Sequence, residues 1–126
     1  MQLDMDLGRE IMLAIEADPE ADGTGGCKIE IPGRSSREIA YHIKQLSLAD
    51  LIKAEDNTTI TGFDWIATDL TPRGHEFLEE SRDKGLWEKA KGTVREHGAP
   101  MTFKVLGLVL AKLAEQAVAK MMGLPS

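Results

Sequence analysis

The fold is decided by SSREIAYHIKQLSLADLIKAE, residues 35–55, in which a capped helix leads without a linker into an extended segment. Ser35 and Glu38 match a capping box, because the serine oxygen and the glutamate can satisfy backbone N–H groups that lack partners inside a helix. Asp50 stands where the chain must leave this helix, a position at which we expect glycine because the left-handed backbone conformation is common there. Leu51 follows at once. The stretch therefore predicts a helix that turns tightly into a strand.

The two faces of this helix differ in chemistry. At 100° per residue, Ile39, Ile43 and Leu46 fall together on an apolar face, which we interpret as core. The opposite face carries Arg37, Tyr41, Lys44 and Gln45. Two interpretations of this polar face stay open: it contacts DNA, or it is the solvated side that any amphipathic helix has.

Two elements are predicted before the central helix. Residues 4–17 carry apolar side chains at the spacing of one buried helical stripe, and acidic residues near the start of the helix complement its dipole. A breaker-rich loop over residues 18–26 leads to residues 28–31, KIEI, whose alternation predicts a short strand closed by Pro32 and Gly33. The predicted order up to this point is helix, short strand, helix.

The central helix is followed by a predicted β-hairpin. Leu51 begins the first strand, residues 63–70 form the second, and the polar loop DNTTITG over residues 56–62 joins them. Helix, short strand, helix, hairpin, helix is the order of a winged helix, in which a helix can enter the major groove of DNA. We therefore predict the α+β class with a winged-helix-like core.

Three helices are predicted after the hairpin. Thr71 caps the first helix, with Pro72 at its first position. The second helix carries apolar residues spaced by threes and fours over residues 86–94 and stops at Gly98. The third begins with Thr102 as its cap, continues to about Met122 and has a broad apolar face. The last two of these helices extend the chain beyond what a winged-helix core needs.

Length and composition suit one domain with a core and an appendage, since the chain has 126 residues and 42% hydrophobic content. We assign residues 1–82 to the winged-helix-like domain and residues 83–126 to a C-terminal helical extension. The single cysteine, Cys27, excludes an internal disulfide, and the acidic start of the chain does not resemble a signal peptide. The most apolar stretch, residues 105–113, is too short to span a bilayer. We therefore expect a cytoplasmic protein without a membrane segment.

The net charge of −6 argues against a general affinity for nucleic acid, since DNA is held mainly through phosphate neutralisation by lysine and arginine. The acidity is concentrated at one end of the chain. Residues 1–27 hold seven acids and one base, residues 28–73 hold seven acids and six bases, and residues 74–126 hold seven acids and eight bases. A local basic face is therefore compatible with the composition.

The stretch LTPRGHEFLEE, residues 70–80, resembles the end of the wing and the following helix in MarR-like winged-helix proteins. Together with MDL at 5–7, YHIKQL at 41–46 and SRDKGLWEKAK at 81–91, it resembles an uncharacterised bacterial and prophage-associated family classed as a domain of unknown function. The resemblance covers nearly the whole chain and implies a winged-helix fold in a phage or mobile-element setting. One departure is that residues 32–34 leave no room for the supporting helix of a standard helix-turn-helix.

The resemblance and the polar helix face lead to a first functional hypothesis: a small non-enzymatic protein that binds double-stranded DNA as a transcriptional regulator. The candidate base readers are Arg37, Tyr41, Lys44 and Gln45, and the candidate phosphate contacts are Arg34, Lys53 and Arg73. The wing loop offers only backbone groups and threonine hydroxyls to a phosphate. The alternative is a protein-interaction module, such as a phage-encoded adaptor or inhibitor, whose acidic N-terminal third engages a basic surface on a host or phage protein.

The last predicted helix has more apolar surface than one small domain normally buries. A second copy of the chain is the simplest cover, because winged-helix proteins often dimerise through helices outside the DNA-binding core and two-fold pairs are the commonest assembly. The candidate interface residues are Trp87, Leu106, Val109, Leu110, Leu113 and Ala117. We therefore expect a homodimer.

No arrangement in the sequence indicates catalysis or a cofactor. His42, His75 and His97 do not pair with further ligands at metal-site spacing, and His42 flanks the apolar helix face, where we expect it to pack with hydrogen bonds. Cys27 has no assigned basic partner, and the GTGG segment at 23–26 lacks the lysine and the preceding strand of a phosphate loop. We expect no metal, no cofactor and no enzymatic activity.

Overall fold

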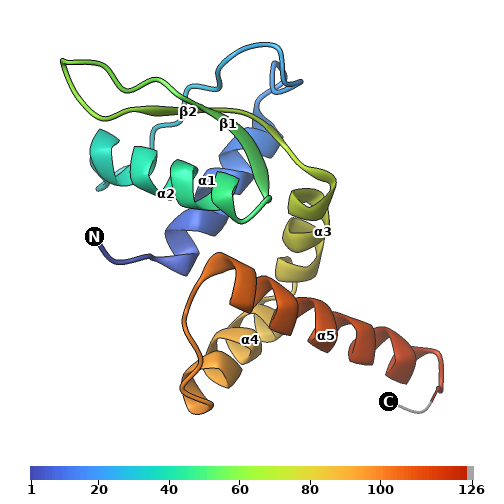
Figure 1. The fold of residues 1–126 in the computed structure, drawn as a ribbon. Coiled ribbons are helices and arrows are strands. Elements are labelled where there is room, and N and C mark those ends of the chain that lie inside the picture. The colour runs from blue at the N-terminus through green and yellow to red at the C-terminus, as the bar shows by residue number, and fades with distance from the viewer. Residues whose placement is uncertain (125–126) are drawn as a thin grey trace. The chain divides into compact units, whose positions relative to one another are not determined.

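The computed structural model describes residues 1–124 and has the predicted α+β class (Figure 1). Over these residues it contains five helices and one two-stranded antiparallel hairpin in a winged-helix-like arrangement. The elements are α1 (Met5–Ala17), α2 (Ser36–Leu48), β1 (Ile52–Asp56), β2 (Trp65–Leu70), α3 (Pro72–Ser81), α4 (Lys84–Glu96) and α5 (Phe103–Met121).

The chain divides into two compact units, Met1–His75 and Glu76–Ser126, and the division falls inside α3. The first unit contains α1, α2 and the hairpin, and the second contains α4 and α5. The boundary that the sequence predicts after residue 82 lies further along the chain, beyond the end of α3. Each unit has its own core.

Side-chain caps fix the starts of α1 and α2. Asp4 Oδ1 accepts a hydrogen bond from the Leu7 backbone N–H at 3.1 Å, and Ser35 Oγ accepts one from the Glu38 N–H at 3.1 Å. The serine half of the predicted capping box is therefore confirmed. The glutamate half differs, because the Glu38 carboxylate accepts a hydrogen bond from Arg34 instead.

The chain leaves α2 through the predicted tight turn. Asp50 has a φ of 60°, the left-handed conformation for which glycine is the usual residue. The Leu51 N–H donates to the Leu46 carbonyl at 3.0 Å, which closes the turn. The first strand then begins at Ile52, so α2 and the hairpin are joined by three residues only.

The hairpin is antiparallel, with Ile52 opposite Leu70 at one end and Asp56 opposite Trp65 at the other. Its register shifts between Lys53 and Ala54, as in a β-bulge. The second strand begins at Trp65 and not at residue 63, so Phe63 belongs to the loop. The loop therefore carries an aromatic side chain that we had predicted to lie in the strand.

The short strand predicted over residues 28–31 is wrong, because this segment has no regular secondary structure. The backbone bonds to β2 come from residues before it: Gly23 N–H donates to the Thr68 carbonyl at 3.1 Å and Cys27 N–H donates to the Ala67 carbonyl at 2.8 Å. The chain has therefore made its backbone contacts with β2 before the alternating segment begins. Alternation alone does not make a strand without a partner edge to continue along.

The core of the first unit is built from the faces that the periodicity predicts. In α1, Leu7, Ile11, Met12 and Ile15 are fully buried. They are joined by buried aliphatic residues of α2 and the hairpin: Ile39, Ile43, Leu46, Leu51, Ile52 and Leu70. The helices α1 and α2 and the hairpin pack against one another in pairs, as Figure 1 shows for the first unit. The polar face of α2 is thereby left on the surface.

The LTPRG motif has a structural role. The Thr71 N–H donates to the Leu51 carbonyl at 3.1 Å, and its hydroxyl donates to the Asp50 carbonyl at 2.6 Å while accepting from the Gly74 N–H at 2.9 Å. A Cβ on Gly74 would lie 1.9 Å from the Leu51 carbonyl oxygen. The motif therefore fixes the start of α3 against the turn that follows α2, and only glycine fits at its last position.

The second unit is a pair of packed helices, α4 and α5, with the end of α3. Asp83 caps α4 by accepting from the Leu86 N–H at 3.1 Å, which starts this helix at Lys84, earlier than the apolar spacing predicts. Phe77 and Trp87 meet edge to face at 5.8 Å between ring centroids. None of the described helices, which lie between residues 5 and 121, is long and apolar enough to cross a membrane.

Candidate nucleic-acid interface

Three of the candidate DNA contacts lie in a stripe along one outward side of α2. Arg37, Tyr41 and Lys44 are spaced at i, i+4 and i+7, so they share one side of the helix. Arg37 is exposed, whereas Tyr41 and Lys44 are half-buried. Gln45, the fourth candidate on this helix, is also half-buried. The stripe is therefore partly covered.

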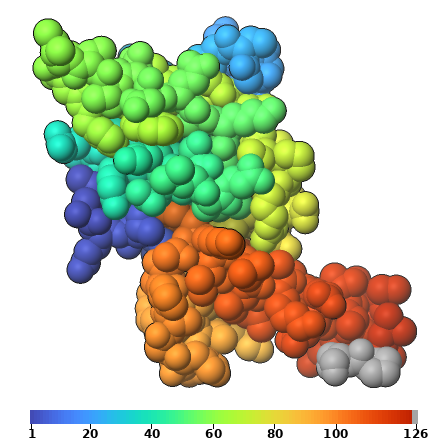
Figure 2. Space-filling model, in the orientation of Figure 1, coloured from blue at the N-terminus to red at the C-terminus, as the bar shows by residue number. Residues whose placement is uncertain are grey.

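Phe63 of the hairpin loop lies against this stripe. The guanidinium carbon of Arg37 is 5.8 Å from the centroid of the Phe63 ring, and the ammonium nitrogen of Lys44 is 6.0 Å from it. Both distances are within the range of cation–π attraction. In Figure 2 the atoms of α2 (teal) and of the hairpin (green) form one continuous face of the first unit. We call Arg37, Tyr41, Lys44 and Phe63 the basic–aromatic cluster.

The basic–aromatic cluster borders a hollow of about 320 Å³. The hollow is lined by Arg37, Tyr41 and Phe63, together with Met1 from the start of the chain. Phe63 was not among the predicted site residues, because we expected it to lie in a strand, and an aromatic residue in a loop gives no periodic signal. The contact became predictable only once the hairpin was known to fold over α2.

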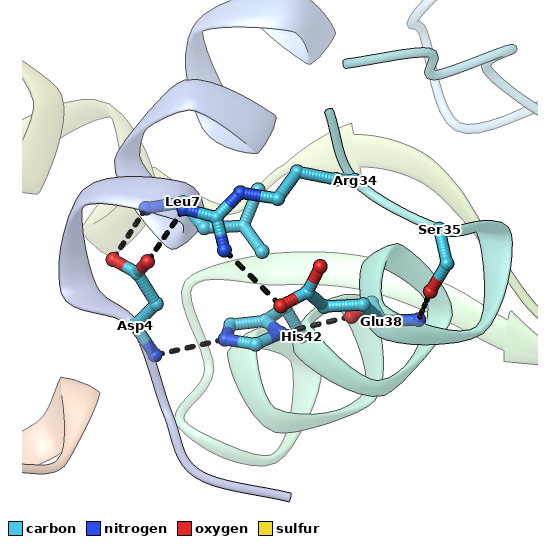
Figure 3. A network of polar contacts seen from close by, with 6 residues as sticks. All are labelled: Asp4, Leu7, Arg34, Ser35, Glu38 and His42. Carbon is cyan, nitrogen blue, oxygen red and sulfur yellow. Dashed lines mark hydrogen bonds and ion pairs between the residues drawn. The ribbon is translucent and has the colours of Figure 1, made fainter. Parts of the chain in front are cut away.

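A polar network behind the cluster joins the start of α1 to α2 (Figure 3). Arg34 donates to Asp4 Oδ2 at 2.7 Å and to Glu38 Oε2 at 3.1 Å. Partial burial opposes ionisation of Asp4, but hydrogen bonds from Arg34 and from the Leu7 N–H outweigh it, so the net effect is a lowered pKa of the Asp4 carboxyl. The guanidinium that we expected to contact phosphate is thus held between two carboxylates.

His42 completes this network from inside α2. Its ring is fully buried, and its Nε2 accepts a hydrogen bond from the Asp4 backbone N–H at 2.9 Å. Its Nδ1 lies 2.8 Å from the Glu38 carbonyl oxygen, which can only accept, so Nδ1 carries the proton. The expectation that His42 packs with hydrogen bonds is confirmed. Since Tyr41 meets His42 edge to face at 5.9 Å, the network also lies next to the basic–aromatic cluster.

The other two candidate phosphate contacts lie outside the cluster. Lys53 is exposed on β1, where it pairs in register with Asp69, and Arg73 is half-buried in the first turn of α3. The structure therefore brings Arg37 and Lys44 to the Phe63 ring, and Tyr41 lines the same hollow as Arg37 and Phe63. The structure places Arg34 in the carboxylate network.

The hairpin loop itself is closed by uncharged and acidic groups. The Asn57 N–H donates to the Asp64 carbonyl at 2.9 Å, and the Thr58 hydroxyl bonds the same carbonyl at 3.2 Å. At its base, the Asp56 carboxyl has a lowered pKa, mainly because it accepts from Thr58 and in part because of the charge on Lys44. As the sequence indicates, residues 57–64 contain no lysine or arginine. The positive charge of this surface comes from α2.

The candidate dimer residues divide by burial. Trp87, Leu106 and Leu110 are buried within the chain, Val109 and Leu113 are half-buried, and Ala117 is exposed. Apolar side chains that α5 exposes lie elsewhere on the helix and at its end: Leu108, Val118, Met121 and Met122. The exposed apolar surface of α5 is therefore not the stripe that the spacing indicated.

The remaining candidate reactive groups are scattered. Burial raises the pKa of the Cys27 thiol, and the charge of Asp18 adds to this effect, so the protonated thiol is favoured. His75 and His97 are exposed. Among residues 1–124, no group of three His, Cys, Asp or Glu side chains is arranged to hold a metal ion.

The family model and the relative that match this sequence carry no described activity. A family model described as "Hypothetical protein (DUF2513)" matches residues 2–100, from before α1 to the end of α4. An "Uncharacterized protein" from Haemophilus influenzae is 30% identical over 119 residues, which are 94% of this chain and 100% of the relative. No solved structure matches.

Proposed function

The chain belongs to the DUF2513 family of hypothetical proteins, and we propose that it is a non-enzymatic DNA-binding protein that uses the basic–aromatic cluster on α2. The observation that carries this proposal is the convergence of Arg37 and Lys44 on the ring of Phe63, beside Tyr41. Cations interleaved with aromatic rings on one exposed surface are the pattern with which proteins hold a sugar-phosphate backbone and its bases.

The cluster offers both kinds of contact that DNA binding needs. The charges of Arg37 and Lys44 can neutralise phosphates, which supplies most of the affinity for any DNA sequence. Tyr41 and Phe63 offer aromatic surface for sugars and bases. Lys53 on β1 follows α2 closely in the chain and gives a further exposed cation on the same unit. In a winged-helix-like arrangement, the helix before the hairpin and the hairpin loop approach DNA together.

Several finer features belong to the same proposal. A distant relationship to MarR-like winged-helix regulators is supported by the LTPRGHEFL motif at the end of the hairpin, and it favours a role as a transcriptional regulator. We place the protein in the cytoplasm and in a phage or prophage setting. We also retain the homodimer, with the apolar side chains that α5 exposes, above all Leu108, as the surface that a second copy would cover.

The charge of the first unit favours a second candidate function. Residues 1–75 hold fourteen acids and seven bases, and the tip of the hairpin presents a fully exposed isoleucine, Ile60. An acidic unit with an apolar tip suits a protein-interaction module that docks on a basic partner surface. This adaptor or inhibitor role leaves Arg37 and Lys44 without a ligand, so we rank it second.

Fluorescence anisotropy with labelled DNA at low salt tests the proposal. The wild-type protein should bind both a random duplex and its separated strand at micromolar concentration, and the affinity should fall as salt rises. Arg37→Ala and Lys44→Ala should each weaken binding several-fold. Lys28→Ala is the matched control, because Lys28 is an exposed cation of the same unit outside the cluster. Binding of neither DNA form, or equal losses in all three variants, would remove the proposal.

A further inference from the structure

The hollow beside α2 has the size and lining of a site for a flat aromatic group. Its volume is about 320 Å³, whereas a cavity of about 150 Å³ is enough to bind benzene in a protein interior. Tyr41 and Phe63 supply two aromatic side chains to its wall, and Arg37 supplies a planar guanidinium that can stack on a ring. These are the side chains on which single-stranded nucleic acids stack their bases.

Hydrogen bonds restrain both segments that carry the aromatic side chains of the hollow. Tyr41 is in the middle of α2, whose start is capped by Ser35 and whose side is tied to the chain before α1 through His42. Phe63 precedes Asp64, whose backbone N–H donates to the Thr58 hydroxyl at 3.1 Å. This bond restrains the loop next to Phe63. The two aromatic side chains are therefore presented by a folded helix and a bonded loop, so little ordering has to accompany binding.

The charges around the hollow favour a ligand of low phosphate density. A duplex carries about one phosphate charge per 1.7 Å of axis, and a single strand carries about half of that. The first unit is acidic, its hairpin loop contains no cation, and Arg34 is engaged by Asp4 and Glu38. The two cations that lie on Phe63 are enough to neutralise a few phosphates of one strand, but not the phosphates of both strands of a duplex.

From this geometry we propose that the hollow takes an unpaired nucleobase, with Tyr41, Phe63 and Arg37 as the stacking groups and Lys44 on an adjacent phosphate. The inference rests on the proposed DNA binding and specifies its form: the protein prefers single-stranded or locally unpaired DNA to an intact duplex. Duplex DNA remains a weaker ligand, held by charge alone.

The test compares three labelled ligands of equal length: a mixed-sequence strand, the same strand annealed to its complement, and a sugar–phosphate strand without bases. The abasic strand keeps the phosphates and removes the stacking. The wild-type protein should bind the mixed-sequence strand at least about fivefold more tightly than either other ligand, as expected for the loss of base stacking. Equal or tighter binding of the duplex, or equal binding of the abasic strand, would overturn the inference.

Two variants of Phe63 separate stacking from folding. Phe63→Leu keeps an apolar side chain but removes the ring, so it should reduce binding of the mixed-sequence strand to the level of the abasic strand, a larger fold-loss than it causes for the duplex. Phe63→Tyr keeps the ring and should restore strand binding. If Phe63→Leu lowers binding of all three ligands equally, the ring has no stacking role and the inference fails. If the wild-type protein binds none of the three ligands, the proposed DNA binding is wrong, and the inference that rests on it is wrong as well.

Discussion

The buried ring of His42 accepts a hydrogen bond from the backbone N–H of Asp4, at 2.9 Å between the two nitrogen atoms. This bond joins residues that are 38 positions apart and ties the start of α1 to the middle of α2. It uses a backbone group at a helix start that has no partner inside the helix. Together with the bond from Nδ1 to Glu38, it satisfies both nitrogens of the ring.

Replacing His42 by alanine should destabilise the first unit by about 2–4 kcal/mol. The change leaves the Asp4 N–H without its acceptor and opens a cavity where a fully buried ring was. Urea denaturation followed by circular dichroism measures the loss. His75→Ala is the control, because His75 is exposed and its removal should change stability by less than about 0.5 kcal/mol. Equal effects of the two substitutions would show that the buried bonds of His42 do not stabilise the fold.

A methyl group at Gly74 should be far more harmful than one at Gly92. A Cβ at residue 74 would lie 1.9 Å from the Leu51 carbonyl oxygen, so α3 or the turn after α2 must shift, whereas a Cβ at residue 92 meets no atom within 4 Å. We expect Gly74→Ala to lower stability by about 2 kcal/mol or more. Gly92→Ala, in the interior of α4, should raise it by about 0.5–1 kcal/mol. Thermal denaturation of both variants decides between these opposite signs.

Much of the fold could be predicted from local signals because these act within a few residues. The caps at Ser35, Thr71 and Thr102 mark helix starts, and apolar periodicity marks the buried faces. The turn at Asp50 was predicted from the abrupt change between helix and strand patterns. The wrong strand at residues 28–31 shows the limit of the method, since a strand depends on a partner edge that lies far away in the sequence.

The candidate site was predicted less completely, because its chemistry depends on contacts between distant segments. Periodicity placed Arg37, Tyr41 and Lys44 on one face of α2. It could not indicate that Phe63 would lie over them, nor that Asp4, 30 residues before Arg34, would join Glu38 in binding its guanidinium. A basic residue is available to a phosphate only if it is not already paired with a carboxylate of its own chain, and the sequence alone does not show such a pairing between distant segments.

Acid should weaken the link between α1 and α2. Because the folded chain lowers the pKa of Asp4 below its ordinary value of about 3.9, its ionised form stabilises the fold above that value, and this contribution is lost as the pH falls through the folded-state pKa. Asp4→Asn keeps a capping oxygen for α1 but removes the charge. The variant should therefore lose less stability than the wild type between about pH 7 and about pH 3 in urea denaturation. In an Arg34→Ala background, the same substitution should alter the pH dependence much less, since the main favourable partner is gone.

The salt dependence of DNA binding should distinguish cations that contact phosphate from those that do not. Each lysine or arginine that neutralises a phosphate releases a counterion, so its removal reduces the slope of log affinity against log salt by about one. We expect this reduction for Arg37→Ala and for Lys44→Ala, whose charged groups lie on Phe63 at the surface. Arg34→Ala should leave the slope nearly unchanged even if it lowers affinity by exposing the negative charges of Asp4 and Glu38, because Arg34 is already paired with both. Anisotropy titrations at four or more salt concentrations measure the slopes. A reduction for Arg34→Ala as large as that for Arg37→Ala would mean that DNA displaces the two carboxylates, and the polar network would then be part of the binding surface itself.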